Sequence, residues 1–268
     1  MLIDITYHCS MGCSHCMADC YPDNSHMSPQ TFKDVLEFIR KHNIPGIHIS
    51  GGEIFEHPQI KDFLDMIAEN EKIYDSKMPV ALITNGRKLS SDPELLNAVQ
   101  DFQKKMGKGK VLIQVTDDPR FYPEKLDEKQ KYRLKKLGAL IDTVPGDPKD
   151  PNRCLYPQGR ALENFDESWW RTNAPKCVNT RFYCVQRPNG TFHDMVMSMV
   201  SAGKLCTPVI SPKGEIKLGE SKLCPPVASI YDSDEEIMKK IKNSNCSGCQ
   251  TSLRIFREKF PELCEMIF

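Results

Sequence analysis

The sequence predicts an α/β fold built on a parallel sheet and followed by a smaller cysteine-rich unit. From residue 2 to about 145, short apolar runs alternate with amphipathic helical patterns, which is typical of repeated strand–helix units. Beyond residue 145 prolines and polar residues weaken this pattern, and a cysteine-rich tail follows from residue 206. With 40% hydrophobic residues, the 268-residue chain can bury a full core.

Each predicted strand is followed by a loop and then by a helix with apolar residues at i, i+3, i+4 and i+7. Ser28 can cap the first helix, and Pro29 suits its first position. The carboxyl ends of parallel strands carry active sites, so we expect the loops after the strands to converge. The predicted strands are 2–7, 46–50, 80–86, 111–118 and 139–145, and the helical faces are Phe32, Val35, Leu36 and Ile39; Ile60, Phe63, Leu64 and Ile67; Leu95, Leu96, Val99 and Phe102; and a charged helix at 124–137.

Composition argues against several classes of protein. No apolar run approaches the eighteen or so residues of a membrane span. Lys plus Arg equals Asp plus Glu, at 36 each, which argues against large nucleic acids as partners, although 104–110 forms a local basic patch. No signal peptide precedes the first of the twelve cysteines, so we expect reduced thiols in the cytoplasm.

The first cysteine cluster follows the first predicted strand. Cys9, Cys13 and Cys16 form a C-x3-C-x2-C pattern, whose spacing suits chelation of one small object. Structural zinc takes four ligands, whereas an iron–sulfur cluster that leaves one iron open needs three thiolates. The pattern favours the open cluster, with zinc or buried thiols as the alternative; Cys20 has no place in it.

A second motif, Gly51, Gly52 and Glu53, follows the second predicted strand. Residues without a Cβ let the backbone approach a ligand closely, and a carboxylate can accept hydrogen bonds from an ammonium group. A tight turn is the alternative interpretation of an isolated glycine pair.

The cysteine motif after the first strand and the Gly-Gly-Glu after the second together resemble the radical S-adenosylmethionine (radical SAM) enzymes. The resemblance implies a partial (β/α)6 barrel over residues 1–200. It also implies that Cys9, Cys13 and Cys16 bind a 4Fe-4S cluster whose fourth iron is chelated by S-adenosylmethionine. Gly51, Gly52 and Glu53 match the family's methionine-binding motif. The chemistry implied is reductive cleavage of S-adenosylmethionine to a 5′-deoxyadenosyl radical, which abstracts hydrogen from a substrate.

Further cofactor contacts rest on the resemblance and on position alone. His15 stands where the family usually has an aromatic residue or histidine near the adenine. Candidates for the remaining contacts lie at strand ends or in a loop, where surface roles fit equally well: Asn85, Thr116 and Arg160, together with Thr84 and Gln114.

The second cysteine cluster reads C-x12-G-x4-C from Cys206 to Cys224, followed by C-x2-C from Cys246 to Cys249. This order resembles the Twitch domain, a truncated relative of the SPASM domain, and implies a small β-hairpin and helix unit over 206–268 with one auxiliary 4Fe-4S cluster. A four-cysteine zinc site is the alternative. The remaining cysteines have no assigned role: Cys20, Cys154, Cys177, Cys184 and Cys264.

The leading functional hypothesis is a two-electron oxidation of an unidentified substrate, in which the auxiliary cluster accepts the second electron. The alternatives are modification of a peptide or protein, as by a maturase or glycyl-radical activase, and a non-catalytic iron–sulfur or zinc electron-transfer module. The implied partners are a small-molecule or peptide substrate and an electron donor such as flavodoxin or ferredoxin.

Overall fold

The computed structural model describes residues 1–23, 25–44, 46–70, 79–143, 158–173, 208–219, 223–243 and 248–263, with side chains described at all of these positions except 172–173, 242 and 248–253. The strands are β1 (Leu2–Thr6), β2 (His48–Gly51), β3 (Val80–Thr84), β4 (Val111–Thr116), β5 (Leu140–Asp142), β6 (Val209–Ile210), β7 (Glu215–Lys217) and β8 (Pro226–Ser229). The helices are α1 (Pro29–Lys41), the 3-10 turn η1 (Ile54–Glu56), α2 (Ile60–Glu69), α3 (Arg87–Ser91), α4 (Pro93–Met106), α5 (Glu128–Lys136), α6 (Arg160–Asn164), α7 (Glu167–Asn173), α10 (Asp234–Asn243) and α11 (Gly248–Lys259).

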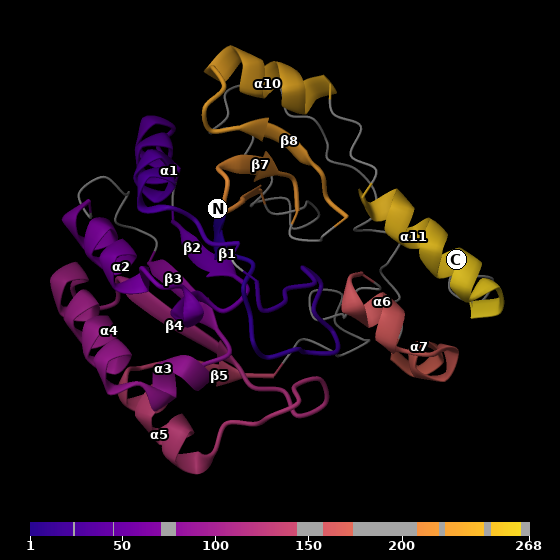
Figure 1. The fold of residues 1–268 in the computed structure, drawn as a ribbon, viewed down its shortest axis with the longest axis horizontal. Helices are drawn as coiled ribbons and strands as arrows, with labels where there is room; N and C mark the ends of the chain where they lie inside the picture. The colour runs from indigo at the N-terminus through magenta and orange to yellow at the C-terminus, as the bar shows by residue number, and fades with distance from the viewer. Residues whose placement is uncertain are drawn as a thin grey trace.

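The five predicted strands form a parallel sheet in which chain neighbours are also spatial neighbours. Within the described residues the full sheet has the order β5-β4-β3-β2-β1-β6-β7-β8, and every pair from β1 to β5 is parallel. This order has no reversal between β1 and β5, as expected for one arc of a (β/α) barrel. Helices α1, α2, α4 and α5 lie along one side of the strands, and the chain after β1 lies on the other (Figure 1). The sequence therefore predicted the α/β fold class correctly.

Local signals explain where the helices begin. Ser28 caps α1 by accepting a hydrogen bond from the Thr31 amide at 3.0 Å, as its position before Pro29 predicted. Asp127 and Gln130 form a capping box at the start of α5, which begins later than the sequence predicted. The sequence analysis missed α3, because five residues are too few to show a helical period.

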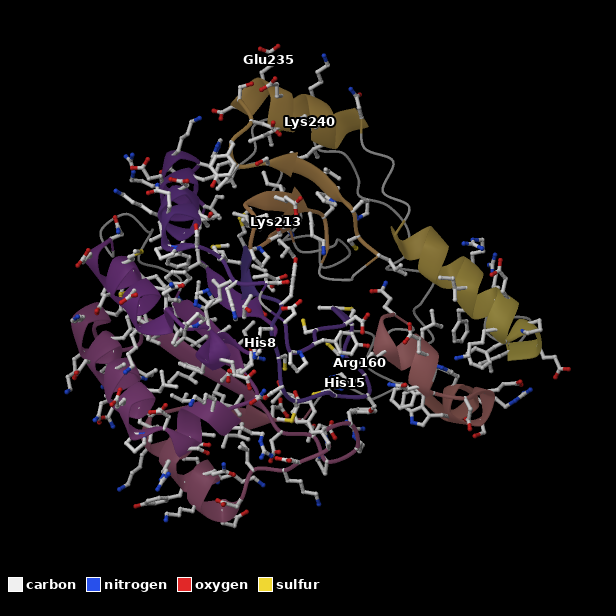
Figure 2. The ribbon with its side chains drawn as sticks, viewed as in Figure 1. His8, His15, Arg160, Lys213, Glu235 and Lys240 are labelled. Atoms are coloured by element: carbon white, nitrogen blue, oxygen red, sulfur yellow. The ribbon has the colours of Figure 1, made fainter. Side chains whose placement is uncertain are left out.

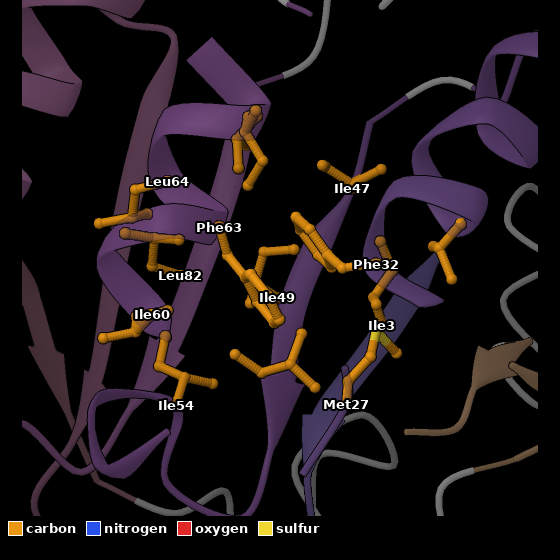
Figure 3. Packing of buried hydrophobic residues seen from close by; sticks show 14 of the residues in the cluster. Ile3, Met27, Phe32, Ile47, Ile49, Ile54, Ile60, Phe63, Leu64 and Leu82 are labelled. Atoms are coloured by element: carbon orange, nitrogen blue, oxygen red, sulfur yellow. The ribbon is translucent and has the colours of Figure 1, made fainter. Parts of the chain in front are cut away.

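The main core lies between the sheet and helices α1 and α2. Phe32 and Phe63 are fully buried and stack with their ring centroids 4.1 Å apart, where they meet the apolar faces of β1 and β2 (Figure 3). Both residues belong to the helical faces that the periodicity predicted. Close packing of such rings fixes the two helices on the sheet and leaves the strand ends free to carry the loops.

The C-terminal strands continue the same sheet. β6 pairs in parallel with β1, on the side away from β2, and β7 and β8 extend the sheet by antiparallel pairing. Strands β7 and β8 are antiparallel neighbours and are followed by α10 (Figure 1), and the Twitch-like unit expected over 206–268 stays a prediction. Because β6 pairs with β1, the cysteine-rich tail is attached to the strand that precedes the first cysteine motif. The division at 200 and 206 stays a prediction.

Phe63→Ala should lower the free energy of unfolding by about 3–5 kcal/mol, because it opens a cavity beside Phe32 in a rigid core. Urea unfolding followed by circular dichroism measures this change. Tyr132→Ala is the control, since Tyr132 is 58% exposed and should change the stability by about 0.5 kcal/mol or less. Equal effects of the two substitutions would show that the core is placed wrongly.

Candidate functional site

The cysteine loop, residues 7–23, leaves the carboxyl end of β1 and carries four cysteines. Cys9, Cys13 and Cys20 are buried in one small cluster, against which Cys16 packs half-buried. The backbone amide of Cys20 donates to the Cys16 Sγ at 3.4 Å. The loop thus brings the three thiols of the C-x3-C-x2-C motif together. Within the described residues, however, no three Cys, His, Asp or Glu side chains converge closely enough to hold a metal ion.

The four thiols differ in their protonation. Burial raises the pKa of Cys9 to about 12 and raises that of Cys13 as well. A hydrogen bond from the Cys20 thiol lowers the pKa of Cys16, and this same contact, together with burial, raises the pKa of Cys20. A thiol must lose its proton to bind a metal, so this loop binds metal ions only with release of protons.

Gly51 and Gly52 allow the end of β2 to press against the start of the cysteine loop. The Gly52 amide donates to the Thr6 carbonyl at 2.7 Å, and the next amide, of Glu53, donates to the His8 carbonyl at 2.9 Å. A Cβ on Gly51 would lie 2.1 Å from the Thr6 oxygen, and one on Gly52 2.1 Å from the His8 oxygen. Both glycines are therefore required by this backbone contact, and the close approach to a ligand that the sequence predicted for them stays a prediction.

Glu53 joins the ends of β2 and β3. Its fully buried carboxylate accepts hydrogen bonds from the Thr84 hydroxyl at 2.6 Å, the Asn85 amide at 2.8 Å and the Phe55 amide at 3.0 Å. Burial nevertheless raises the pKa of Glu53 to about 7. The predicted residues Thr84 and Asn85 therefore do meet the Gly-Gly-Glu segment, as holders of its carboxylate.

His15 and Thr116 are connected through an aromatic pair after β4. The His15 ring lies 4.9 Å from the Phe121 ring and 5.6 Å from the Tyr122 ring, measured between centroids. Thr116 hydrogen-bonds the Tyr122 side chain, whereas Gln114 is exposed. The buried Nδ1 of His15 has no hydrogen-bond partner in the described part of the chain. Burial lowers the pKa of His15 to about 4, so this ring is neutral and offers a polar atom inside an apolar surrounding.

Arg160, at the first position of α6, binds the cysteine loop. Its Nε donates to the Cys13 carbonyl at 2.8 Å and its Nη1 to the Cys20 carbonyl at 2.7 Å. Its backbone amide donates to the Cys16 carbonyl at 3.0 Å, and its guanidinium lies 4.6 Å from the centroid of the Tyr21 ring. Figure 2 labels Arg160 beside α6.

Two polar contacts of the loop were missed by the sequence analysis. Glu56 binds the amide of Ser10 at 2.9 Å and also its hydroxyl, and it lies 3.3 Å from His8 Nε2. Asn164 Nδ2 donates to the Ser14 carbonyl at 3.0 Å. Glu56 stands three residues after Glu53, in a segment that the sequence had already singled out, and this position could have identified it as a site residue. No sequence feature pointed to Asn164.

Of the proposed second cluster, only the Cys224 side chain is described, and it is buried, 4% exposed. Cys249 lies in the first turn of α11, and its side chain is outside the described set. The other cysteines of the C-terminal half lie outside the described residues: Cys154, Cys177, Cys184, Cys206, Cys246 and Cys264.

With this geometry in view, comparison with known proteins defines the class. Residues 3–102, from β1 to α4, match the sequence model of the Radical SAM superfamily, and this segment contains both the cysteine loop and the Gly-Gly-Glu. This part of the chain is a radical SAM domain, and the superfamily consists of enzymes that use a 4Fe-4S cluster and S-adenosylmethionine.

Particular relatives are more distant. The antilisterial bacteriocin subtilosin biosynthesis protein AlbA of Bacillus subtilis (strain 168) is 27% identical over 104 residues, which cover 38% of this chain and 21% of AlbA. The match thus spans about a fifth of that relative's length.

Two solved structures share the fold. BtrN in complex with AdoMet and 2-DOIA has a TM-score of 0.53 at 13% identity, covering 96% of this chain and 86% of BtrN. Native anSMEcpe with bound AdoMet and the Kp18Cys peptide has a TM-score of 0.51 at 13% identity, covering 100% of this chain and 98% of anSMEcpe. None of the described helices is long and apolar enough to cross a membrane.

Glu53→Gln should remove a pH dependence of stability. Because the folded pKa of about 7 exceeds the ordinary value of 4.5, unfolding releases a proton from Glu53 between these values. The free energy of unfolding from this group therefore falls as the pH rises from 4.5 to 7, by on the order of 2–3 kcal/mol, and is constant above. Urea unfolding at pH 5 and pH 7.5 measures the difference between wild type and variant. The exposed Glu37→Gln serves as the control, and parallel pH profiles for wild type and Glu53→Gln would contradict the prediction.

Proposed function

We propose that the chain is a radical SAM enzyme that cleaves S-adenosylmethionine reductively and takes a hydrogen atom from an organic substrate. The observation that carries this proposal is the packing of Cys9, Cys13 and Cys16 in one loop at the carboxyl end of β1, against the Gly51–Glu53 segment. When bound, the 4Fe-4S cluster and S-adenosylmethionine supply the electron transfer and the 5′-deoxyadenosyl radical.

The chain's own residues have separate roles in this proposal. Cys9, Cys13 and Cys16 lose their protons and hold the cluster, because three thiols in one partly dry loop provide its donor set. His15 offers its unpaired Nδ1, within a ring stack, to the adenine. Gly51, Gly52 and Glu53 set the edge against which the methionine part lies, with Asn85 and Thr116 as the neighbouring polar groups.

For the reaction we propose a two-electron oxidation assisted by an auxiliary 4Fe-4S cluster on Cys206, Cys224, Cys246 and Cys249. The shared fold with BtrN, solved with AdoMet and 2-DOIA, supports a small-molecule substrate. An electron donor such as flavodoxin or ferredoxin and a reducing cytoplasm complete this proposal. A zinc ion in the second site would leave the substrate electron without this acceptor.

Modification of a peptide is the second candidate. It is favoured by the similarity of residues in this chain to AlbA, a bacteriocin biosynthesis protein, and by the anSMEcpe fold solved with a bound peptide. A non-catalytic electron-transfer module is less well supported, because it would not need the Gly51–Glu53 segment. Incubation with a peptide library and with polyol substrates, read by the mass of the product, separates the two substrate classes.

Replacing Cys9, Cys13 or Cys16 by alanine should abolish formation of 5′-deoxyadenosine, because each removes one of three thiolate ligands. The assay follows anaerobic reconstitution, addition of a strong reductant and chromatography of the nucleoside. Cys154→Ala is the control, since Cys154 lies outside the motif and has no assigned role; Cys20→Ala tests in addition whether Cys20 is a ligand. Loss of the nucleoside with Cys20→Ala but not with Cys16→Ala would overturn the assigned ligand set.

Cys246→Ala should remove about four of about eight irons per chain, spare cleavage of S-adenosylmethionine and impair substrate turnover. Iron and sulfide analysis of the reconstituted protein measures the first effect, with Cys264→Ala as the matched control. Four irons together with one zinc in the wild type would remove the auxiliary-cluster part of the proposal and leave the cleavage reaction intact.

A further inference from the structure

Arg160 directs its hydrogen-bond donors into the protein. The residue is 7% exposed, and its Nε and Nη1 are bound to the carbonyls of Cys13 and Cys20. Nη1 also lies 3.6 Å from the carboxylate of Asp19, in the same loop. A buried guanidinium persists only when its donors and charge are matched, and here the cysteine loop supplies the partners. This arrangement differs from the cofactor contact that the sequence analysis expected for Arg160.

The residue before Arg160 also requires close approach to the loop. Gly159 has φ +53°, and a Cβ there would lie 2.3 Å from the Cys16 oxygen and 2.6 Å from the Met17 oxygen. The Arg160 amide donates to the same Cys16 carbonyl. Any larger residue at Gly159 would push α6 away from the loop and break these bonds.

Helix α6 is itself held from the other side by the C-terminal helix α11. Lys259 Nζ donates to the carbonyls of Leu162 at 2.7 Å and Glu163 at 3.1 Å, which belong to the last turn of α6. The buried Trp170 packs edge-on against Phe256, with ring centroids 5.4 Å apart, in one apolar cluster that joins α6, α7 and α11. A helix of five residues has little stability of its own, so these contacts fix its position.

We propose that Arg160 is a positioning residue which, with Gly159 and Asn164, shapes the cysteine loop before any cluster is bound. It acts through the loop backbone: α6 binds the carbonyls of Cys13, Cys16 and Cys20, so that the backbone of the loop is held in one conformation. Its consequence for the cluster rests on the proposed function, whereas the order of the loop in the metal-free protein does not. The positive charge of Arg160 also acts on the thiols of Cys13 and Cys16, where it stabilises added negative charge.

The test compares Arg160→Gln, which removes the positive charge and part of the hydrogen-bond donors of the guanidinium, with Arg160→Lys and with the exposed control Arg254→Gln. Amide hydrogen exchange of the full-length, metal-free protein is followed by mass spectrometry. The Ser14 amide, bonded to the Phe121 carbonyl, and the Asp19 amide, bonded to the Cys16 carbonyl, report on the loop. We expect exchange in peptides covering residues 13–20 to speed up about tenfold or more in Arg160→Gln, less in Arg160→Lys and not in the control, with α1 and α2 unchanged.

A second readout excludes a merely structural role. In reconstituted protein, Arg160→Gln should shift the midpoint potential of the cluster to more negative values, and Arg160→Lys should keep it close to the wild-type value, because lysine preserves the charge. Unchanged exchange of the loop in metal-free Arg160→Gln overturns the proposal. If Arg160→Gln does not fold, Asn164→Ala replaces it, because this variant removes only the hydrogen bond to the Ser14 carbonyl. We expect faster amide exchange at Ser14 in Asn164→Ala, and unchanged exchange there would also overturn the proposal. Wild-type protein that takes up no cluster would defeat the proposed function and leave the exchange result standing.

Discussion

The site depends on one close approach between two stretches of backbone. The amides of Gly52 and Glu53 bond the carbonyls of Thr6 and His8, and no side chain can fit between them. This contact fixes where the cysteine loop leaves β1. The buried carboxylate of Glu53 extends the same constraint to β3 through Thr84 and Asn85. Three neighbouring strand ends are thereby locked into one rigid edge, which a loop carrying ligands needs if its geometry is to be reproducible.

Periodicity was sufficient to predict the central part of the fold, because the apolar faces of α1 and α2 repeat every three to four residues and the strands are short apolar runs. The pairing of β6 with β1 was not predictable, since a two-residue strand carries no period. The motif residues were singled out for the same local reason, because the cysteines and the glycine pair are unusual in spacing; their roles as ligands and cofactor contacts stay a prediction. The contacts of Arg160 were not predictable, because its partners are backbone carbonyls of a loop more than 130 residues earlier, and carbonyls leave no trace in a sequence.

The charge distribution around the loop follows from its burial. Three thiols that must ionise to bind metal lie where burial favours the protonated form, as the raised pKa of Cys9 and Cys13 shows. The guanidinium of Arg160 opposes this effect, because its charge lowers the pKa of Cys13 and Cys16. The hydrogen bond from the Cys20 thiol also lowers the pKa of Cys16. Aromatic rings of Tyr7 and Tyr122 pack against the same cluster and limit water. A buried loop beside the guanidinium of Arg160 suits an anionic cluster, since attraction between charges is stronger where water is excluded.

The C-terminal part of the chain is connected to the cysteine loop through two elements: β6 pairs with β1, from which the loop leaves, and α11 supports α6, which binds the loop. Cys249 lies in the first turn of α11, and Lys259, which binds α6, is at its end. A metal bound near the start of α11 would therefore restrain a helix whose other end supports the first cysteine loop. If the proposed second site binds a metal, ordering of one cysteine site would then lower the conformational entropy that remains to be lost at the other. On this reasoning the tail has a structural reason to follow the radical SAM domain, independent of any electron that passes between the sites.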